Sequence, residues 1–225
     1  MLRIGHRGAC GYAPENTILS FSTALQLNVD MIELDVHICK SGEIVVIHDD
    51  KVDRTTNGTG YVSEKTLDEL RIMDAGKGEK IPTLQEVLDL VNKKVKLNIE
   101  LKGTGTAKPV FQLLKKYIRE FSWTYDDFLI SSFNQNELQE FRDLDQRFNI
   151  GVLGMGFFIS LVEFAEKINA YSLNIYANSI NKELVDDAQR KNMKVIAWTV
   201  NDTEDIKKIE TMGIDGIISN YPDRI

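Results

Sequence analysis

Ionisable side chains in this sequence collect at the ends of short apolar runs. They comprise three carboxylates, two histidines and two cations: Glu33, Asp35, Glu100, His6, His48, Arg7 and Lys102. The apolar runs that lead into them cover residues 2–4, 31–32 and 44–47, and residues 95–102 repeat the pattern. A packed core does not require charged groups at strand ends, whereas a metal-assisted hydrolase does. These residues are therefore the first candidates for an active site.

The three carboxylates would repel one another if they met without a neutralising partner. A hard divalent cation removes this repulsion, and ligand sets made only of oxygen favour Mg²⁺ or Ca²⁺ over zinc. The alternative is a buried ion network in which the acids pair with Arg7 and Lys102. Two histidines beside such a cluster favour paired general acid and base work, and a cation beside a metal ion is a frequent clamp for phosphate.

The elements that must position these groups alternate between extended and helical patterns. The extended segments that we expect are residues 2–5, 31–38, 43–48, 96–101, 128–132, 149–153, 171–175, 194–200 and 216–219. Strands that alternate with helices indicate a parallel sheet covered by helices, either open or closed into a barrel.

Helix-start signals stand between most of the extended segments. Three of them resemble a capping box or its asparagine variant: Thr66-x-x-Glu69, Thr83-x-x-Glu86 and Asn134-x-x-Glu137. Residues 14–17 predict a further helix start, because proline, asparagine and threonine suit that position. We also expect a helix over residues 63–73 and an amphipathic helix over residues 110–121.

One junction between extended segments is too short for a parallel crossover. Only residues 40–42 separate the segment that carries Asp35 from the segment that leads to His48, whereas a parallel connection needs about a dozen residues. The pair must be an antiparallel hairpin that turns near Ser41-Gly42. A two-residue turn places Asp35 opposite His48, although a one-residue bulge would shift this register. Eight parallel strands then remain, which predicts a (β/α)8 TIM barrel with a hairpin elaboration after the second strand.

In a barrel, side chains at the carboxyl ends of the strands converge on the mouth, where active sites lie. Alternation places Asn98, Glu100 and Lys102 on one face of their strand, so Glu100 can meet Glu33 and Asp35. His37 shares the face of these two acids. It lies further toward the hairpin turn, and a hard cation gains little from an imidazole, so we do not expect it to be a ligand or a base.

Composition limits the other possibilities. The chain has 225 residues and a net charge of −7, which offers no basic face to nucleic acid. No apolar run approaches a membrane span, and a first strand that begins at Leu2 leaves no room for a cleavable leader. The two isolated cysteines, Cys10 and Cys39, are no disulfide framework. We therefore expect one cytoplasmic domain over residues 1–225, without stable membrane anchoring.

Several short stretches together resemble the glycerophosphodiester phosphodiesterases, in particular the short bacterial cytoplasmic type. The matching stretches are His6-Arg7-Gly8, residues 14–17, Glu33-Leu34-Asp35-Val36, residues 40–42, 45–49, 98–102, 132–133 and 197–201, and residues 216–222. They run from the first expected strand to the last. The barrel and the hairpin of that family agree with the strand count above.

The resemblance implies a role for each candidate residue. Three carboxylates would hold one divalent cation: Glu33, Asp35 and Glu100. His6 and His48 would be the acid–base pair, and Glu15 and Asn16 would have supporting roles. The substrate would be a small glycerophosphodiester, and its products would be an alcohol and sn-glycerol 3-phosphate.

The resemblance also implies how the substrate is held. Arg7 and Lys102 would contact the phosphate, and Phe133 and Trp198 would form apolar walls. Plain core packing is the alternative for both aromatic side chains. A lysophospholipase D-like enzyme or another phosphodiesterase on the same barrel is a second reading, and a non-catalytic binding protein is a third. The sequence does not distinguish the head group, Mg²⁺ from Ca²⁺, attack by water from attack by a glycerol hydroxyl, or the oligomeric state.

Overall fold

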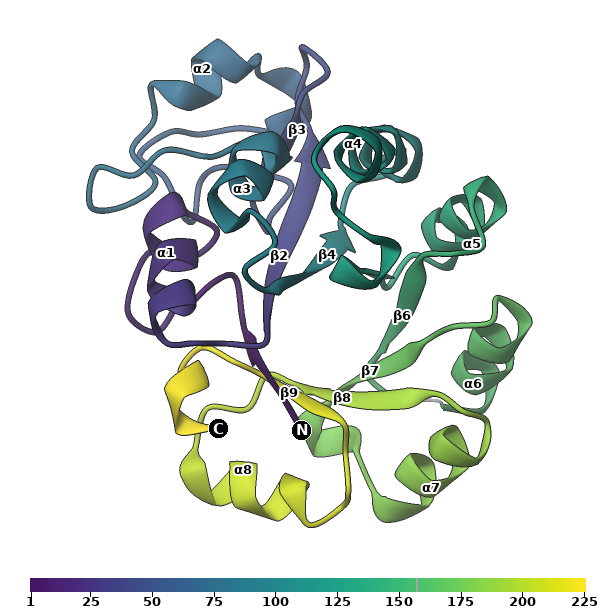
Figure 1. Cartoon of the computed structure of the whole chain (residues 1–225). Helices are drawn as coiled ribbons and strands as arrows, with labels where there is room; N and C mark the ends of the chain where they lie inside the picture. Colours follow the sequence, from purple (N-terminus) through teal and green to yellow (C-terminus); the bar gives the residue numbers. More distant parts are fainter. Residues whose placement is uncertain (157) are drawn as a thin grey trace.

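Parallel strands alternate with helices along the chain, and the strands converge on a common centre with helices outside them (Figure 1). The computed structural model describes residues 1–156 and 158–225. The strands are β1 (Leu2–Gly5), β2 (Met31–Ile38), β3 (Ile44–Val46), β4 (Lys96–Leu101), β5 (Phe128–Ser132), β6 (Asn149–Gly154), β7 (Ser172–Tyr176), β8 (Lys194–Trp198) and β9 (Gly216–Ser219). The helices are α1 (Ile18–Gln26), α2 (Leu67–Arg71), α3 (Leu84–Val91), α4 (Ala107–Glu120), α5 (Gln135–Leu144), α6 (Phe158–Lys167), α7 (Lys182–Arg190) and α8 (Thr203–Glu210). Short 3-10 turns are η1 (Val62–Glu64), η2 (Tyr125–Asp127), η3 (Ala177–Ser179) and η4 (Pro222–Arg224).

The sheet closes on itself. Within the described residues, eight parallel strands follow one another in the order β1-β9-β8-β7-β6-β5-β4-β2, and β1 also pairs with β2. Strand β3 lies outside this ring and pairs antiparallel with β2. The predicted (β/α)8 barrel with a hairpin elaboration after the second strand is therefore confirmed.

The register of the hairpin differs by one residue from the prediction. Val36 pairs with Val46, and the backbone N–H of Cys39 donates to the carbonyl of Glu43 at 3.0 Å. The loop has three residues rather than two, because Gly42 adopts a φ of 98° that glycine tolerates without strain. Asp35 consequently lies beside Ile47, whose N–H donates to its carbonyl at 3.0 Å, and not opposite His48. His48 follows the end of β3 as part of a loop.

Two of the three expected capping boxes are confirmed, at Thr66 and at Thr83. The third is wrong, because the Asn134 side chain accepts from Asn136 without a reciprocal bond. The Glu137 carboxylate instead accepts from the N–H of Ala107 at the start of α4, at 2.8 Å. The helix expected over residues 63–73 is split into η1 and α2, because the Thr66 cap has extended backbone (φ −72°, ψ 162°) and cannot lie inside a helix.

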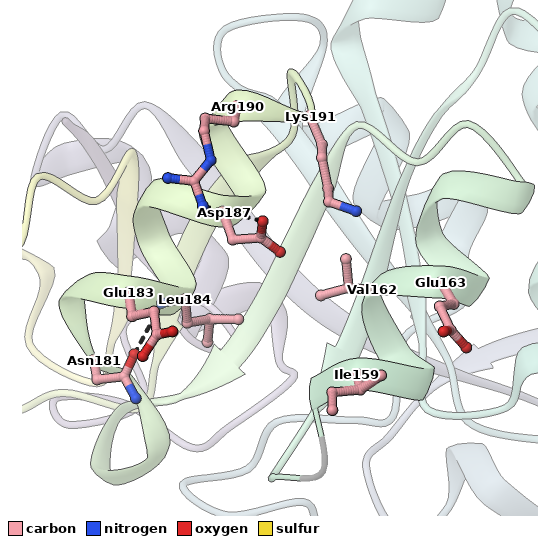
Figure 2. A pocket seen from close by; sticks show the side chains of 9 residues that line it. All are labelled: Ile159, Val162, Glu163, Asn181, Glu183, Leu184, Asp187, Arg190 and Lys191. Carbon is pink, nitrogen blue, oxygen red and sulfur yellow. Dashed lines mark hydrogen bonds and ion pairs between the residues drawn. The ribbon is translucent and has the colours of Figure 1, made fainter.

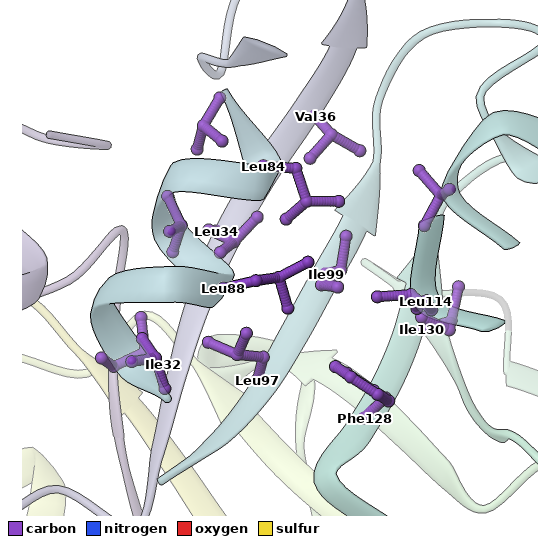
Figure 3. Close-up of a cluster of buried hydrophobic side chains, with 14 of the residues drawn as sticks. Ile32, Leu34, Val36, Leu84, Leu88, Leu97, Ile99, Leu114, Phe128 and Ile130 are labelled. Atoms are coloured by element: carbon purple, nitrogen blue, oxygen red, sulfur yellow. The ribbon is translucent and has the colours of Figure 1, made fainter. Parts of the chain in front are cut away.

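Alternation along β2 separates the two environments of the sheet. Ile32, Leu34 and Val36 point outward and pack against α3, where Leu84 and Leu88 meet them (Figure 3). All of these side chains are fully buried, and each such burial contributes about 1.5–3 kcal/mol. The intervening residues of β2 must then point into the barrel.

An apolar layer fills part of the barrel interior. Five buried side chains form this layer: Ile4, Met31, Leu129, Ile196 and Ile218. Among the polar residues of the sequence analysis, His6 follows β1, and Glu100 and Lys102 stand at the carboxyl end of β4. Glu33 and Asp35 lie within the longer strand β2. The apolar layer and the outer helical layer together position the polar mouth.

Candidate active site

Three carboxylates meet at the mouth of the barrel, where β2 and β4 run side by side. In their parallel register Glu33 pairs with Asn98 and Asp35 pairs with Glu100. Each acid offers an oxygen within 4.8 Å of an oxygen of the other two, and all three side chains are buried. The two strands thus bring together the acids that the sequence analysis singled out.

Burial and mutual repulsion make ionisation of these acids costly. Burial, the charge of Asp35 and the charge of Glu100 raise the pKa of Glu33 well above its usual value. Burial and the charge of Asp35 raise the pKa of Glu100 to about 7. Among the described residues, none supplies a hydrogen-bond partner for one buried oxygen of Asp35, Oδ1. Converging oxygen donors, one of them unsatisfied, fit a hard divalent cation.

Two cations approach the acids but do not balance them. Arg7 Nε lies 3.4 Å from Asp35 Oδ2 without hydrogen-bond geometry, while its Nη1 donates to Glu15 at 2.7 Å. Lys102 Nζ lies 3.0 Å from Glu100 Oε1. The buried ion network that the sequence left open is therefore present in part. Since Arg7 is shared with a fourth carboxylate, Arg7 and Lys102 do not neutralise the three acids when all of them are ionised.

Both candidate histidines reach this cluster. His6 follows β1, and its Nδ1 lies 2.6 Å from Asn220 Oδ1. Burial, reinforced by the charge of Arg7, lowers the pKa of His6 to about 4. His48 lies between two partners, with Asp49 Oδ1 2.6 Å from its Nδ1 and Lys102 Nζ 3.1 Å from its Nε2.

One cavity is lined by both histidines, both cations and two of the acids, whereas Asp35 is not among its lining residues. Its lining comprises His6, Arg7, Glu33, His48, Asn98, Glu100, Lys102, Ser131, Phe133, Leu153, Trp198, Thr199 and Ile218. His37 is not part of it. The His37 ring lies 3.1 Å, through Nε2, from the carbonyl oxygen of His48, and burial lowers its pKa.

The two aromatic candidates form one side of the cavity. The rings of Phe133 and Trp198 meet edge to face, with 5.5 Å between their centroids. Trp198 Nε1 donates to the carbonyl of Asn174 at 2.9 Å, so the indole is anchored to β7. The Phe133 side chain is exposed. An exposed aromatic ring at a cavity rim is not explained by core packing.

Glu15 and Asn16 contact the site from the segment before α1. Asn16 Nδ2 donates to Asp35 Oδ2 at 2.8 Å, from a left-handed backbone with φ 57° that asparagine tolerates. Glu15 accepts from Arg7. Thr17 caps α1, as predicted, by accepting from the N–H of Ser20.

Three neighbours of the site were not assigned from the sequence. Asp49 contacts His48, Asn220 contacts His6, and Arg54 contacts both Asp49 and Glu15. Asp49 and Asn220 stand inside stretches that carry the family resemblance, so that signal could have nominated them. Arg54 lies in a segment of turns without apolar periodicity, and no pattern pointed to it.

A wider groove lies on the outer helical layer between α6 and α7 (Figure 2). Its lining mixes apolar Ile159 with charged side chains, and some of these pair with one another, as Arg190 does with Asp187 at 3.2 Å. Histidine is absent from this lining. The chemistry is therefore concentrated at the barrel mouth rather than in this groove.

A (β/α)8 barrel with acids, bases and cations at the carboxyl ends of its strands has the architecture of a barrel enzyme. The sequence matches the glycerophosphoryl diester phosphodiesterase family over residues 6–224, and the chain is an enzyme of this family. The resemblance noted in the sequence is thereby confirmed. Among the helices that the structure describes, none has the length and apolarity to cross a bilayer.

Relatives match the chain almost from end to end. YhdW of Bacillus subtilis is 40% identical over 240 residues, covering 100% of this chain and 96% of its own. A glycerophosphodiester phosphodiesterase of Caldanaerobacter subterraneus is 39% identical over 233 residues, covering 100% of this chain and 96% of its own. The solved structure of an Oleispira antarctica phosphodiesterase in complex with the product sn-glycerol-3-phosphate has a TM-score of 0.91 and 31% identity, covering 99% of this chain and 94% of that one.

Proposed function

We propose that this protein hydrolyses glycerophosphodiesters to an alcohol and sn-glycerol 3-phosphate, with one divalent cation, Mg²⁺ or Ca²⁺, as cofactor. The observation that carries the proposal is a single cavity lined by two histidines, two cations and two acids of the carboxylate cluster, Glu33 and Glu100. The product bound in the Oleispira antarctica relative agrees with this substrate class. Free Cys10 and Cys39 suit a reducing compartment, so we place the enzyme in the cytoplasm.

Glu33, Asp35 and Glu100 would hold the cation, which supplies positive charge that draws electron density from phosphorus. Arg7 and Lys102 bind the phosphate oxygens, because both cations line the cavity beside the acids. Their side chains also keep the excess carboxylate charge from repelling the anionic substrate. Binding of the phosphate therefore depends on the balance between the cluster and its cations.

The two histidines exchange protons with the reacting oxygens. One of them removes a proton from the attacking oxygen, which belongs to water or to a glycerol hydroxyl. The other donates a proton to the alkoxide that leaves when the P–O bond breaks. His6 Nδ1 is held by the side-chain amide oxygen Oδ1 of Asn220, so its Nε2 remains available for this exchange.

The apolar wall of Phe133 and Trp198 would contact the carbon skeleton of the glycerol or the departing alcohol. Because the Phe133 ring of this wall is exposed, a longer apolar substituent of the substrate could also pack against it. Lysophospholipids are for this reason the second candidate substrate class.

The decisive experiment is an assay of the purified protein against three substrate classes: glycerophosphodiesters, lysophospholipids and cyclic phosphodiesters. Each is measured with Mg²⁺, with Ca²⁺ and with excess chelator after dialysis. We expect glycerophosphodiester turnover that the chelator abolishes and either metal restores. Full turnover in excess chelator would reject the metal-dependent mechanism. Turnover of lysophospholipids alone would instead support the second candidate.

A further inference from the structure

Arg54, on the loop between β3 and η1, forms two paired contacts at once. Its guanidinium donates to Asp49 through Nε at 2.7 Å and through Nη2 at 3.0 Å. It also donates to Glu15 through Nη1 at 2.9 Å and through Nη2 at 2.8 Å. Bidentate contacts of this kind define orientation as well as distance, and a lysine cannot reproduce them.

Each of the two carboxylates also holds a group of the proposed active site. Asp49 contacts His48 Nδ1 at 2.6 Å, and Glu15 accepts from Arg7 Nη1 at 2.7 Å. A continuous chain of contacts thus runs from His48 through Asp49, Arg54 and Glu15 to Arg7. Hydrogen bonds from Arg54 keep the pKa of Asp49 far below its usual range.

The hydrogen-bond partners of His48 are compatible with only one tautomer of its ring. The Asp49 carboxylate can only accept, so Nδ1 must carry the hydrogen. The Lys102 ammonium can only donate, so Nε2 must present its lone pair. The orientation of Asp49 therefore determines both the tautomer and the direction of the His48 ring.

The loop that carries Arg54 is held by contacts of its own. The N–H of Val52, a fully buried residue, donates to the carbonyl of Gly60 at 3.0 Å. The N–H of Gly60 also donates to Asp53 at 2.8 Å. The Arg54 side chain itself is about half exposed at 48%. Exposed ion pairs contribute only about 0–1 kcal/mol to stability, so the loop does not need Arg54 in order to fold.

We propose that Arg54 is a positioning residue that aligns His48 with Arg7 across the mouth of the barrel. The effect of Arg54 on catalysis rests on the proposed function. The part of the proposal that concerns the orientation of the His48 ring can be tested without measuring turnover. Outer partners of this kind typically change activity by about 10–10²-fold when they are removed.

The first test is kinetic. Arg54→Met should lower kcat by about 10–10²-fold and raise KM, because His48 and Arg7 are both misaligned. Asp49→Asn should lower chiefly kcat, and Glu15→Gln should raise chiefly KM. Adding either change to Arg54→Met should cost little more, since the chain of contacts is already broken. Additive effects of the two changes would contradict the proposal.

The second test reads the histidine rings directly. The chain has three histidines, so long-range ¹H–¹⁵N spectra can resolve the tautomer of each. We expect Arg54→Met and Arg54→Lys to change the His48 ring nitrogens from a fixed Nδ1–H form to an averaged one, while His6 stays unchanged. A His48 signal and a kcat within about twofold of wild type in both variants would overturn the proposal.

Arg147 provides the matched control. It forms a bidentate pair with Asp145 at 2.9 and 2.7 Å, just before β6 and therefore at the amino ends of the strands. Arg147→Met should alter neither the His48 spectrum nor turnover. If the wild-type protein hydrolyses no glycerophosphodiester, the proposed function fails, whereas the ring spectra still decide the role of Arg54.

Discussion

At the scale of single residues, the main energetic feature of the site is the free-energy cost of ionising buried carboxyl groups. Glu33 and Glu100 have raised pKa values because burial removes their hydration and the neighbouring acids repel them. Near pH 7 the metal-free protein therefore retains protons in the cluster that isolated glutamates would have lost. A metal ion can bind there only as these protons leave.

Metal binding should accordingly release protons and weaken as the pH falls. Titration of the dialysed protein with Mg²⁺ or Ca²⁺ in buffers of different ionisation enthalpy should show net proton release at pH 7. The apparent affinity should drop between pH 8 and pH 6, because the pKa of Glu100 is about 7. Glu100→Gln should release fewer protons and bind metal more weakly. Identical heats in all buffers would contradict the assignment.

The three histidines should differ sharply in their importance. His6→Ala and His48→Ala should each lower kcat by about 10²–10⁴-fold, as expected for lost acid or base groups. His37→Gln should stay within a few-fold of wild type, because His37 is outside the cavity and its contact is with a backbone carbonyl. Steady-state kinetics on the three purified variants decide this. A His37 variant as inactive as the others would overturn the assignment.

At the scale of elements, β2 does two tasks with one alternating sequence. Ile32, Leu34 and Val36 pack against α3, whereas Glu33 and Asp35 point into the barrel. The hairpin that follows returns the chain to the same mouth, so His48 reaches Lys102 of the segment after β4. The acids and the histidine depend on the same strand for their placement.

Glu137 ties two neighbouring helices together. From α5 its carboxylate accepts from the N–H of Gly105 at 2.6 Å and of Ala107 at 2.8 Å, where α4 begins. Glu137→Ala should lower the free energy of unfolding by about 1–3 kcal/mol, because buried N–H groups lose their partner. Urea unfolding measures the change. Glu140→Ala, at an exposed position of the same helix, is the control and should shift stability by less than about 0.5 kcal/mol.

At the scale of the whole molecule, closure of the barrel brings distant segments into contact. β1 pairs with β9, so His6 meets Asn220 across 214 residues of sequence. The acids likewise come from two strands that α2 and α3 separate in the chain. A cation held by these acids would therefore connect two segments that are far apart in the sequence, and its binding would stabilise the folded state.

Divalent metal should stabilise the entire fold, and more strongly at high pH. A ligand at 100 times its Kd adds about 2.7 kcal/mol. Raised pKa values mean that, without metal, the acid cluster favours folding at low pH and loses that contribution as the pH rises through about 7. The metal-induced increase in Tm should thus be larger at pH 8 than at pH 5.5. Glu100→Gln should reduce the pH dependence and leave the part that comes from Glu33. An equal shift at both pH values in the wild-type protein would refute the linkage.

The sequence was sufficient to predict the features that depend only on residues close together in the chain. Apolar runs and their alternation indicated the strands, and the short interval between β2 and β3 required a hairpin. Threonine and glutamate three residues apart predicted the caps at Thr66 and Thr83. The family resemblance identified the acids, histidines and cations that the cavity brings together.

Only the tertiary structure decided the features that depend on closure. The hairpin register follows from the positive φ of Gly42, which the residue type permits but does not require. Glu137 left its expected capping box because a neighbouring helix offered unpaired N–H groups. Arg54 gained its place from two carboxylates, one of them 39 residues away. The sequence alone determined which groups the site can use, whereas barrel closure determined their partners, since contacts between distant segments exist only once the ring is complete.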